Sequence, residues 1–262
     1  MSVVTLLTDF GEKDAYVAEM KGVILGIVED VRIVDISHKV TPYSIDEGAF
    51  LLLTAVPYFP EGTVHVAVVD PGVGTDRRGI IVETEVCTLV GPDNGLLIPA
   101  AKRCGSFNVF EITNREYMLS SKTHTFHGRD VFASVAGYLA KGVDAEEMGR
   151  RIEDYVEERF FILEEMTEET MVRVLHVDRF GNIVTNLKGD AVLKQVKYGD
   201  RIKVSINGKE YVMPFLKSYG FTGRGEFLLT VGGTGFLEVA VNQGSAAKSL
   251  DVEVGGTFTL FL

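Results

Sequence analysis

The 262-residue chain contains only two cysteines, Cys87 and Cys104. Two thiols so far apart in the sequence are too few for a thiolate metal site, and they fit a reducing compartment, so we expect each to be a buried structural thiol. Glutamine is also scarce, since only Gln195 and Gln243 are present. A low glutamine content is a feature of heat-adapted proteins.

Positive charge is in short supply as well. The chain has 26 lysines and arginines against 37 aspartates and glutamates, which gives a net charge of −11. Such a chain lacks the basic surface that general nucleic-acid binding needs, whereas a small cationic substrate is compatible with it. It contains no apolar run of the ~20 residues that a membrane span requires. Its first residues also lack the basic segment of a signal peptide, so we expect a cytoplasmic protein.

Several sequence motifs of common enzymes are missing. There is no GxxxxGK[ST] phosphate loop, no GxGxxG segment after a strand, no HExxH or paired-histidine metal motif and no GxSxG nucleophile elbow. The sequence therefore offers none of the usual elements of nucleotide phosphate binding, zinc hydrolysis or serine catalysis.

The most informative stretch is 68–78, which reads VVDPGVGTDRR. A valine-rich run feeds into it and predicts a buried strand, after which the chain turns at once at Asp70. Pro71 restricts the backbone, whereas Gly72 and Gly74 permit conformations that a side chain disfavours, so a tight loop can fold Arg77 back toward Asp70. The alternative is that Asp70 only caps a turn and Arg77 is a solvated surface charge.

The first half of the chain alternates between strand and helix patterns. Apolar strand candidates at 3–7, 31–36 and 64–69 alternate with helical patterns at 16–27 and 44–56. This order is typical of a mostly parallel sheet with helices on both faces, as in a Rossmann-like α/β domain. A short helix at 95–102 and a strand at 109–112 follow. Asp9, like Asp70, stands at the end of a predicted strand, where open α/β sheets bind ligands.

His127 lies in the segment 124–130, HTFHGRD, just before a helix whose apolar face runs from Val131 to Leu139. The helix dipole at this position disfavours an imidazolium and biases His127 toward its neutral form. We interpret Asp130 as a first-turn residue favoured by the same dipole, and His124 as a surface residue. A capping or turn role is the alternative for His127.

From residue 171 onward the pattern changes to short strands. They are expected at 171–177, 201–206, 210–213, 227–231, 236–241 and 256–262, separated by glycine-containing turns. This pattern predicts a small β-barrel or sandwich. We therefore expect an N-terminal α/β domain over 1–167 and a C-terminal β-barrel domain over 168–262, with the charged stretch 146–169 linking them.

Five segments, taken together and in order, carry a resemblance to a known family. They are 8–11 (TDFG), 69–77 (VDPGVGTDR), 126–130 (FHGRD), 178–182 (DRFGN) and 242–247 (NQGSAA). With them the chain resembles the S-adenosyl-L-methionine (SAM) hydroxide adenosyltransferases, the SAM hydrolases related to fluorinase and chlorinase. It departs from many relatives at 233–235, where Gly-Thr-Gly replaces Ser-Ser-Gly.

The resemblance implies a homotrimer of α/β and β-barrel domains, with active sites between subunits. It implies that SAM is the substrate, that no cofactor or metal is required, and that water attacks C5′ to give adenosine and L-methionine. No inserted loop of the halogenase kind is present, so hydroxide rather than halide is the expected nucleophile. The implied catalytic residues are Asp70, Arg77 and His127. The implied substrate-binding residues are Asp9 for the ribose hydroxyls, and Asp178, Asn182, Ser218, Tyr219, Glu226 and Ser245 for adenine and methionine.

Two alternative functions remain open. Asp9, Asp70 and His127 could hold a metal ion in a phosphoester hydrolase, which predicts that a chelator abolishes activity. A SAM or adenosine sensor would bind its ligand without turnover. From the residues alone, the expectation is an α/β plus β protein that acts on a small molecule at the carboxyl edge of its sheet.

Overall fold

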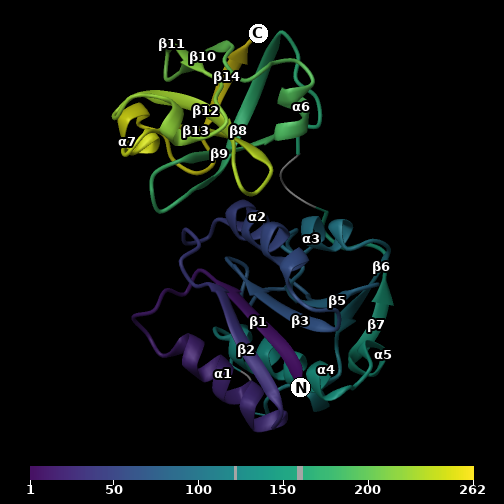
Figure 1. Cartoon of the computed structure of the whole chain (residues 1–262). Coiled ribbons are helices and arrows are strands. Elements are labelled where there is room, and N and C mark those ends of the chain that lie inside the picture. The colour runs from purple at the N-terminus through teal and green to yellow at the C-terminus, as the bar shows by residue number, and fades with distance from the viewer. Residues whose placement is uncertain (121–122, 158–161) are drawn as a thin grey trace. The chain divides into compact units, whose positions relative to one another are not determined.

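The computed structural model describes residues 1–120, 123–157 and 162–262. The chain divides into two compact units, Met1–Arg159 and Phe160–Leu262, and each has its own sheet (Figure 1). None of the described helices is long and apolar enough to cross a membrane.

The first unit is a seven-stranded sheet covered by helices. Its elements are β1 (Ser2–Thr8), α1 (Tyr16–Ile27), β2 (Val31–Ser37), α2 (Ile45–Ala55), η1 (Val56–Tyr58), β3 (Thr63–Val68), β4 (Gly79–Thr84), β5 (Cys87–Pro92), α3 (Ile98–Arg103), β6 (Phe107–Ile112), η2 (Arg115–Tyr117), η3 (Gly128–Ala133), α4 (Ser134–Lys141), α5 (Ala145–Met148) and β7 (Gly149–Ile152). The strand order is β2-β1-β3-β5-β4-β6-β7. β2, β1, β3 and β5 run parallel, while β4, β6 and β7 add antiparallel pairs.

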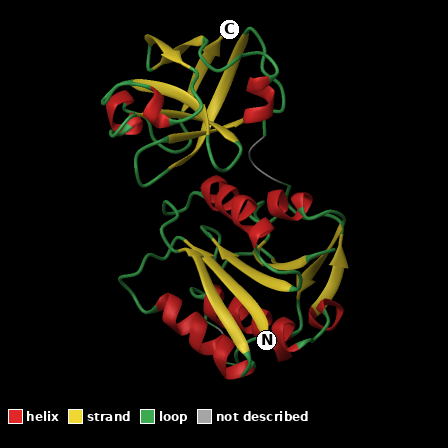
Figure 2. Ribbon diagram, viewed as in Figure 1, coloured by secondary structure: helices red, strands yellow, loops and turns green. Residues whose placement is uncertain are grey.

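Helices lie on both faces of this sheet, as Figure 2 shows, with α1 and α4 on one face and α2 and α3 on the other. The interior strands are mostly apolar, which suits a sheet buried on both sides, and every residue of β3 is buried. The predicted α/β architecture is confirmed. β4 and β5 are additions that the sequence interpretation did not contain.

The second unit is an antiparallel, barrel-like sheet. Its elements are β8 (Glu169–Val177), β9 (Ile183–Lys188), α6 (Gly189–Leu193), β10 (Arg201–Ile206), β11 (Lys209–Pro214), η4 (Tyr219–Phe221), β12 (Phe227–Val231), β13 (Phe236–Val241), α7 (Ala246–Leu250) and β14 (Thr257–Phe261). The strand order is β11-β10-β14-β8-β9-β13-β12. A bridge between Phe215 and Leu229 joins the two edges, so the sheet nearly closes on itself, as the predicted barrel requires.

One buried histidine in the first unit makes stability sensitive to acid. His65 of β3 is fully buried, its Nδ1 lies 2.7 Å from the Thr5 hydroxyl, and its Nε2 has no hydrogen-bond partner among the described residues. Burial lowers the pKa of His65 to about 4. Between pH 6.5 and 4, His65 is therefore protonated in the unfolded chain, where its pKa is near 6.5, but stays neutral in the folded chain.

Consequently, the free energy of unfolding of the first unit is expected to fall by about 3 kcal/mol because of His65 as the pH drops from 6.5 to 4. Urea unfolding at several pH values should show this loss. The variant His65→Leu cannot ionise, so its stability should decline less over the same range. Parallel pH dependences of the two proteins would contradict the assignment.

Candidate active site

The loop after β3 carries the central pair of charges. Two turns form it, because Val73 N–H donates to Asp70 O and Thr75 N–H donates to Gly72 O, both at 3.2 Å. Gly74 has φ of 78°, and a Cβ at this position would lie 2.3 Å from the carbonyl oxygen of His124. Gly74 is therefore needed both for its backbone conformation and for the close approach of the 124 segment. Gly72, in contrast, does not adopt a positive φ.

Arg77 folds back onto Asp70, as the loop pattern predicts. Its Nε donates to Asp70 Oδ1 at 3.1 Å and its Nη2 donates to Oδ2 at 2.5 Å. The two side chains are only 10% and 5% exposed, which rules out a solvated surface arginine. Burial raises the pKa of Asp70 and the Arg77 guanidinium opposes this rise, with the net direction upward. This carboxylate is therefore a stronger base than an exposed one.

The Arg77 guanidinium, which binds Asp70, also contacts His127. Arg77 Nη2 lies 3.2 Å from His127 Nδ1. A guanidinium can only donate, so Nδ1 must accept and the neutral ring carries its hydrogen on Nε2. His127 is buried and occupies the N-cap position of η3, a π-helical turn, without a capping hydrogen bond from its side chain. The local dipole favours the same neutral form.

The segment that carries His127 is held by the helix that follows it. The carboxylate of buried Asp130 accepts hydrogen bonds from the backbone N–H and the hydroxyl of Thr123, at 2.6 and 2.7 Å. Arg129 Nε donates to the other oxygen of Asp130 at 2.6 Å. Asp130 thus has a structural role, which agrees with its interpretation as a first-turn residue.

A cavity of about 280 Å³ opens beside this group. Asp70 and His127 line it together with three aromatic side chains, Phe10, Tyr16 and Phe126. The aromatic rings contact one another edge to face, with centroids 5.0 to 5.9 Å apart. Such walls suit a flat heterocycle or a cationic group, while Asp70 and His127 supply the polar end.

Asp9 stands at the end of β1, as predicted. Its Oδ2 accepts a hydrogen bond from Tyr43 N–H at 2.9 Å. Its charge contributes to the raised pKa of Asp70, so the two carboxylates are electrostatic neighbours. The structure thus brings Asp9, Asp70, Arg77 and His127 to one region of the first unit.

The second unit has a cavity of its own, of about 570 Å³. Three predicted residues line it: Asp178, Asn182 and Tyr219. Asp178 closes the turn between β8 and β9, because its Oδ1 accepts from the backbone N–H groups of Phe180 and Asn182. Its Oδ2 accepts from Asn182 Nδ2 at 2.8 Å. The Asp178 carboxylate therefore orients the Asn182 amide at the cavity wall.

Glu238 contacts one residue of the cavity wall, Tyr219, and was missed by sequence interpretation. It lies on β13, is 5% exposed, and accepts a hydrogen bond from the Tyr219 hydroxyl at 2.8 Å. Burial raises the pKa of Glu238, and burial together with this contact raises the pKa of Tyr219. A charged residue within the otherwise apolar strand at 236–241 was the signal that could have indicated it.

The other predicted contacts occupy varied positions. The Ser245 hydroxyl accepts from Lys248 N–H at the start of α7, and a Cβ on Gly181 would lie 2.0 Å from it, so Ser245 packs against the Asp178 turn. Glu226 accepts hydrogen bonds from the Thr222 hydroxyl and from Gly223 N–H within an exposed turn. Ser218, Glu226 and Ser245 are not among the residues that line the second-unit cavity.

No group of three or more histidine, cysteine, aspartate or glutamate side chains in the described ranges is arranged to hold a metal ion. The hypothetical set Asp9, Asp70 and His127 does not form such a group. In this structure Asp70 and His127 are instead hydrogen-bonded to Arg77.

Both halves of the chain match models of one protein family. Residues 4–149 match the SAM hydroxide adenosyltransferase N-terminal domain and residues 172–259 match its C-terminal domain. The chain therefore belongs to the SAM hydroxide adenosyltransferase family, as its motifs indicate.

Individual relatives agree with this membership. The chain is 42% identical over 265 residues to a Methanocaldococcus jannaschii protein named (R)-S-adenosyl-L-methionine hydrolase, covering 97% of this chain and 93% of that one. A protein named fluorinase from Nocardia brasiliensis is 27% identical, with 97% and 94% covered. The crystal structure of an uncharacterized conserved protein from Thermotoga maritima superimposes with a TM-score of 0.93 at 37% identity, covering 99% of this chain and all of the other.

Proposed function

We propose that this protein is a hydrolase that cleaves SAM into adenosine and L-methionine. The observation that carries the proposal is the hydrogen-bonded set of Asp70, Arg77 and His127 at an aromatic cavity, in a chain of this family. Relatives named (R)-S-adenosyl-L-methionine hydrolase share 35 to 42% of their residues with it over nearly its whole length. The lower identity to the fluorinases favours water over halide as the nucleophile.

The proposed reaction is a displacement at C5′ of the ribose. A lone pair of water forms the new O–C5′ bond while the C5′–S bond breaks, and the sulfur leaves as the neutral thioether of methionine. A neutral leaving group needs no general acid, so the site has only to orient the water and remove one of its protons.

The three residues have distinct proposed roles. Nδ1 of His127 is occupied by Arg77, so its Nε2–H is a donor that holds the attacking oxygen. Asp70 lines the cavity and its pKa is raised by burial, so it accepts the proton of the water. Arg77 aligns both side chains and offsets the charge that develops on the oxygen.

Substrate recognition is proposed to involve both units. In this scheme Asp9 accepts two hydrogen bonds from the ribose hydroxyls. The residues proposed to contact adenine and methionine are Asp178, Asn182, Ser218, Tyr219, Glu226 and Ser245. We further propose a cytoplasmic homotrimer, with each site shared between subunits, that needs neither metal nor cofactor. The domain boundary at 167/168 stays a prediction.

The proposal is tested by incubating the purified protein with the (R) and (S) sulfonium epimers of SAM in ¹⁸O-labelled water, with and without EDTA. We expect labelled adenosine and unlabelled methionine from the (R) epimer, at a rate that EDTA does not change. Bound but intact SAM would instead support a sensor. Activity that EDTA abolishes would support a metal-dependent reaction.

A further inference from the structure

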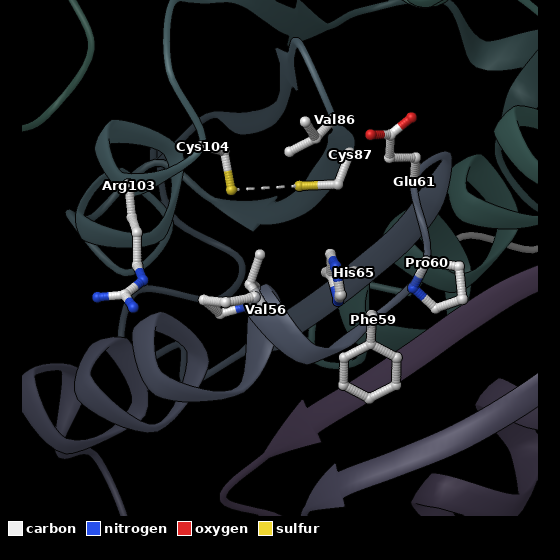
Figure 3. Close-up of a pocket in the computed structure, with 10 residues that line it drawn as sticks. Val56, Phe59, Pro60, Glu61, His65, Val86, Cys87, Arg103 and Cys104 are labelled. Carbon is white, nitrogen blue, oxygen red and sulfur yellow. Dashed lines mark hydrogen bonds between the residues drawn. The ribbon is translucent and has the colours of Figure 1, made fainter. Parts of the chain in front are cut away.

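The only two cysteines of the chain meet at a cavity that the proposed reaction does not use. Cys87 begins β5 and Cys104 caps the C-terminus of α3. Their sulfur atoms lie 3.7 Å apart and point toward each other, as Figure 3 shows. The sequence interpretation treated them as separate thiols, whereas the fold makes them a pair.

The surroundings of the pair allow a small oxidant to reach it. Cys87 is buried and Cys104 is half-buried. Both line a cavity of about 350 Å³, together with apolar side chains such as Val56 and Phe59 and the charged Glu61 and Arg103 (Figure 3).

The segment between the two cysteines holds the catalytic loop at both ends. Asn94 Nδ2 donates to Val69 O at 2.9 Å, directly before Asp70. After Arg77, the Arg78 guanidinium pairs with the Asp93 carboxylate at 2.7 Å, and Asp93 N–H donates to Arg78 O at 2.9 Å. We call these contacts of Asp93 and Asn94 with Val69 and Arg78 the clamp. A covalent bond between Cys87 and Cys104 would close a loop that contains Asp93 and Asn94.

We propose that Cys87 and Cys104 are a redox-controlled cross-link: a low-molecular-weight disulfide oxidises them to an intramolecular disulfide that stabilises the clamp on the Asp70–Arg77 loop. The more accessible Cys104 attacks one sulfur of the reagent and expels one thiol. Cys87 then displaces the second thiol as the protein disulfide forms. One disulfide is reduced to two thiols while two protein thiols lose two electrons and two protons, so the exchange balances. The sulfur atoms need only approach to about 2.05 Å.

The pair should react slowly at neutral pH and faster in alkali. Burial and the neighbouring Cys87 raise the pKa of Cys104 to about 12. Only the thiolate attacks a disulfide, so the rate of cross-linking should rise about ten-fold for each pH unit between pH 7 and 10. The reduced pair thus persists at neutral pH, and alkali together with an oxidant drives the exchange.

The test treats the full chain at pH 10, where the exchange should be fastest, with oxidised glutathione or with dithiothreitol, then alkylates it under denaturing conditions for mass spectrometry and measures its melting temperature. We expect no alkylated cysteine, a peptide linking Cys87 to Cys104, and a first-unit Tm about 5–10 °C higher after oxidation. The cysteine-free variant with Cys87→Ser and Cys104→Ser should show no change with either reagent.

Cysteines that remain free to be alkylated after the oxidation would overturn the proposal. Glutathione adducts in place of the linked peptide, bonds between chains, or a disulfide that leaves the Tm unchanged would overturn it as well. The peptide analysis uses the unsubstituted chain, so it stands even if the serine variants fold poorly. Neither measurement depends on SAM hydrolysis, so the cross-link and the proposed reaction succeed or fail separately.

Discussion

Replacing Arg77 with lysine is expected to lower kcat about 10²–10³-fold while KM changes little. The guanidinium uses Nε and Nη2 to bind both oxygens of Asp70, and Nη2 also reaches His127. A lysine ammonium is a point charge on a flexible stem and cannot make this fork. The variant keeps the positive charge at position 77, but it no longer aligns Asp70, the proposed proton acceptor, with His127, the proposed hydrogen-bond donor.

Steady-state kinetics with SAM measures this loss, and two other variants make the result specific. Arg150→Lys changes an exposed arginine paired with Glu111, so it should leave both constants unchanged. Asp9→Ala removes the proposed ribose contact and should mainly raise KM. A kcat for Arg77→Lys within a few-fold of the unsubstituted enzyme would exclude the alignment role, and unchanged turnover in His127→Ala would remove His127 from the mechanism.

The parts of the fold that could be predicted are those with long, regular patterns. The strands at β1, β2 and β3 are apolar runs next to helices of clear period, so their parallel order followed from the sequence. β4 and β5 are short and separated by two residues, Glu85 and Val86, so neither run stood out. β9 was missed because Thr185 and Asn186 look exposed, yet both are buried, and their side chains bond to Leu237 O and Arg173 N–H.

The same distinction applies to the site. Asp70 and Arg77 are seven residues apart on one glycine loop, so their contact could be argued from local geometry. The aromatic wall needs Phe10, Tyr16 and Phe126 from three segments, and the cysteine pair joins a strand to a helix end. Contacts of this kind depend on the tertiary arrangement, which no local pattern in one sequence encodes. Glu238 is a similar case, because its Tyr219 partner lies on another element.

The second large effect concerns how the site is assembled. The proposed water-activating residues lie in the first unit, whereas the cavity lined by Asn182 and Tyr219 lies in the second. If each site uses the first unit of one subunit and the second unit of its neighbour, two inactive variants can complement each other. Arg77→Ala removes a proposed catalytic residue from the first unit and leaves the second unit unchanged. The double variant Asn182→Ala, Tyr219→Ala removes two proposed substrate contacts from the second unit and leaves the first unchanged.

Co-expression of these two chains in equal amounts is expected to restore about one quarter of the unsubstituted activity, because random assembly of a cyclic oligomer gives about one site in four with both halves intact. Differently tagged chains, purified through both tags, would verify that mixed oligomers form. The matched control pairs Arg77→Ala with His127→Ala, in which every site keeps a damaged first unit and no activity should return. If mixed oligomers form but the first pair is as inactive as this control, the sites are contained within single chains, and a shared site is wrong even if the protein hydrolyses SAM.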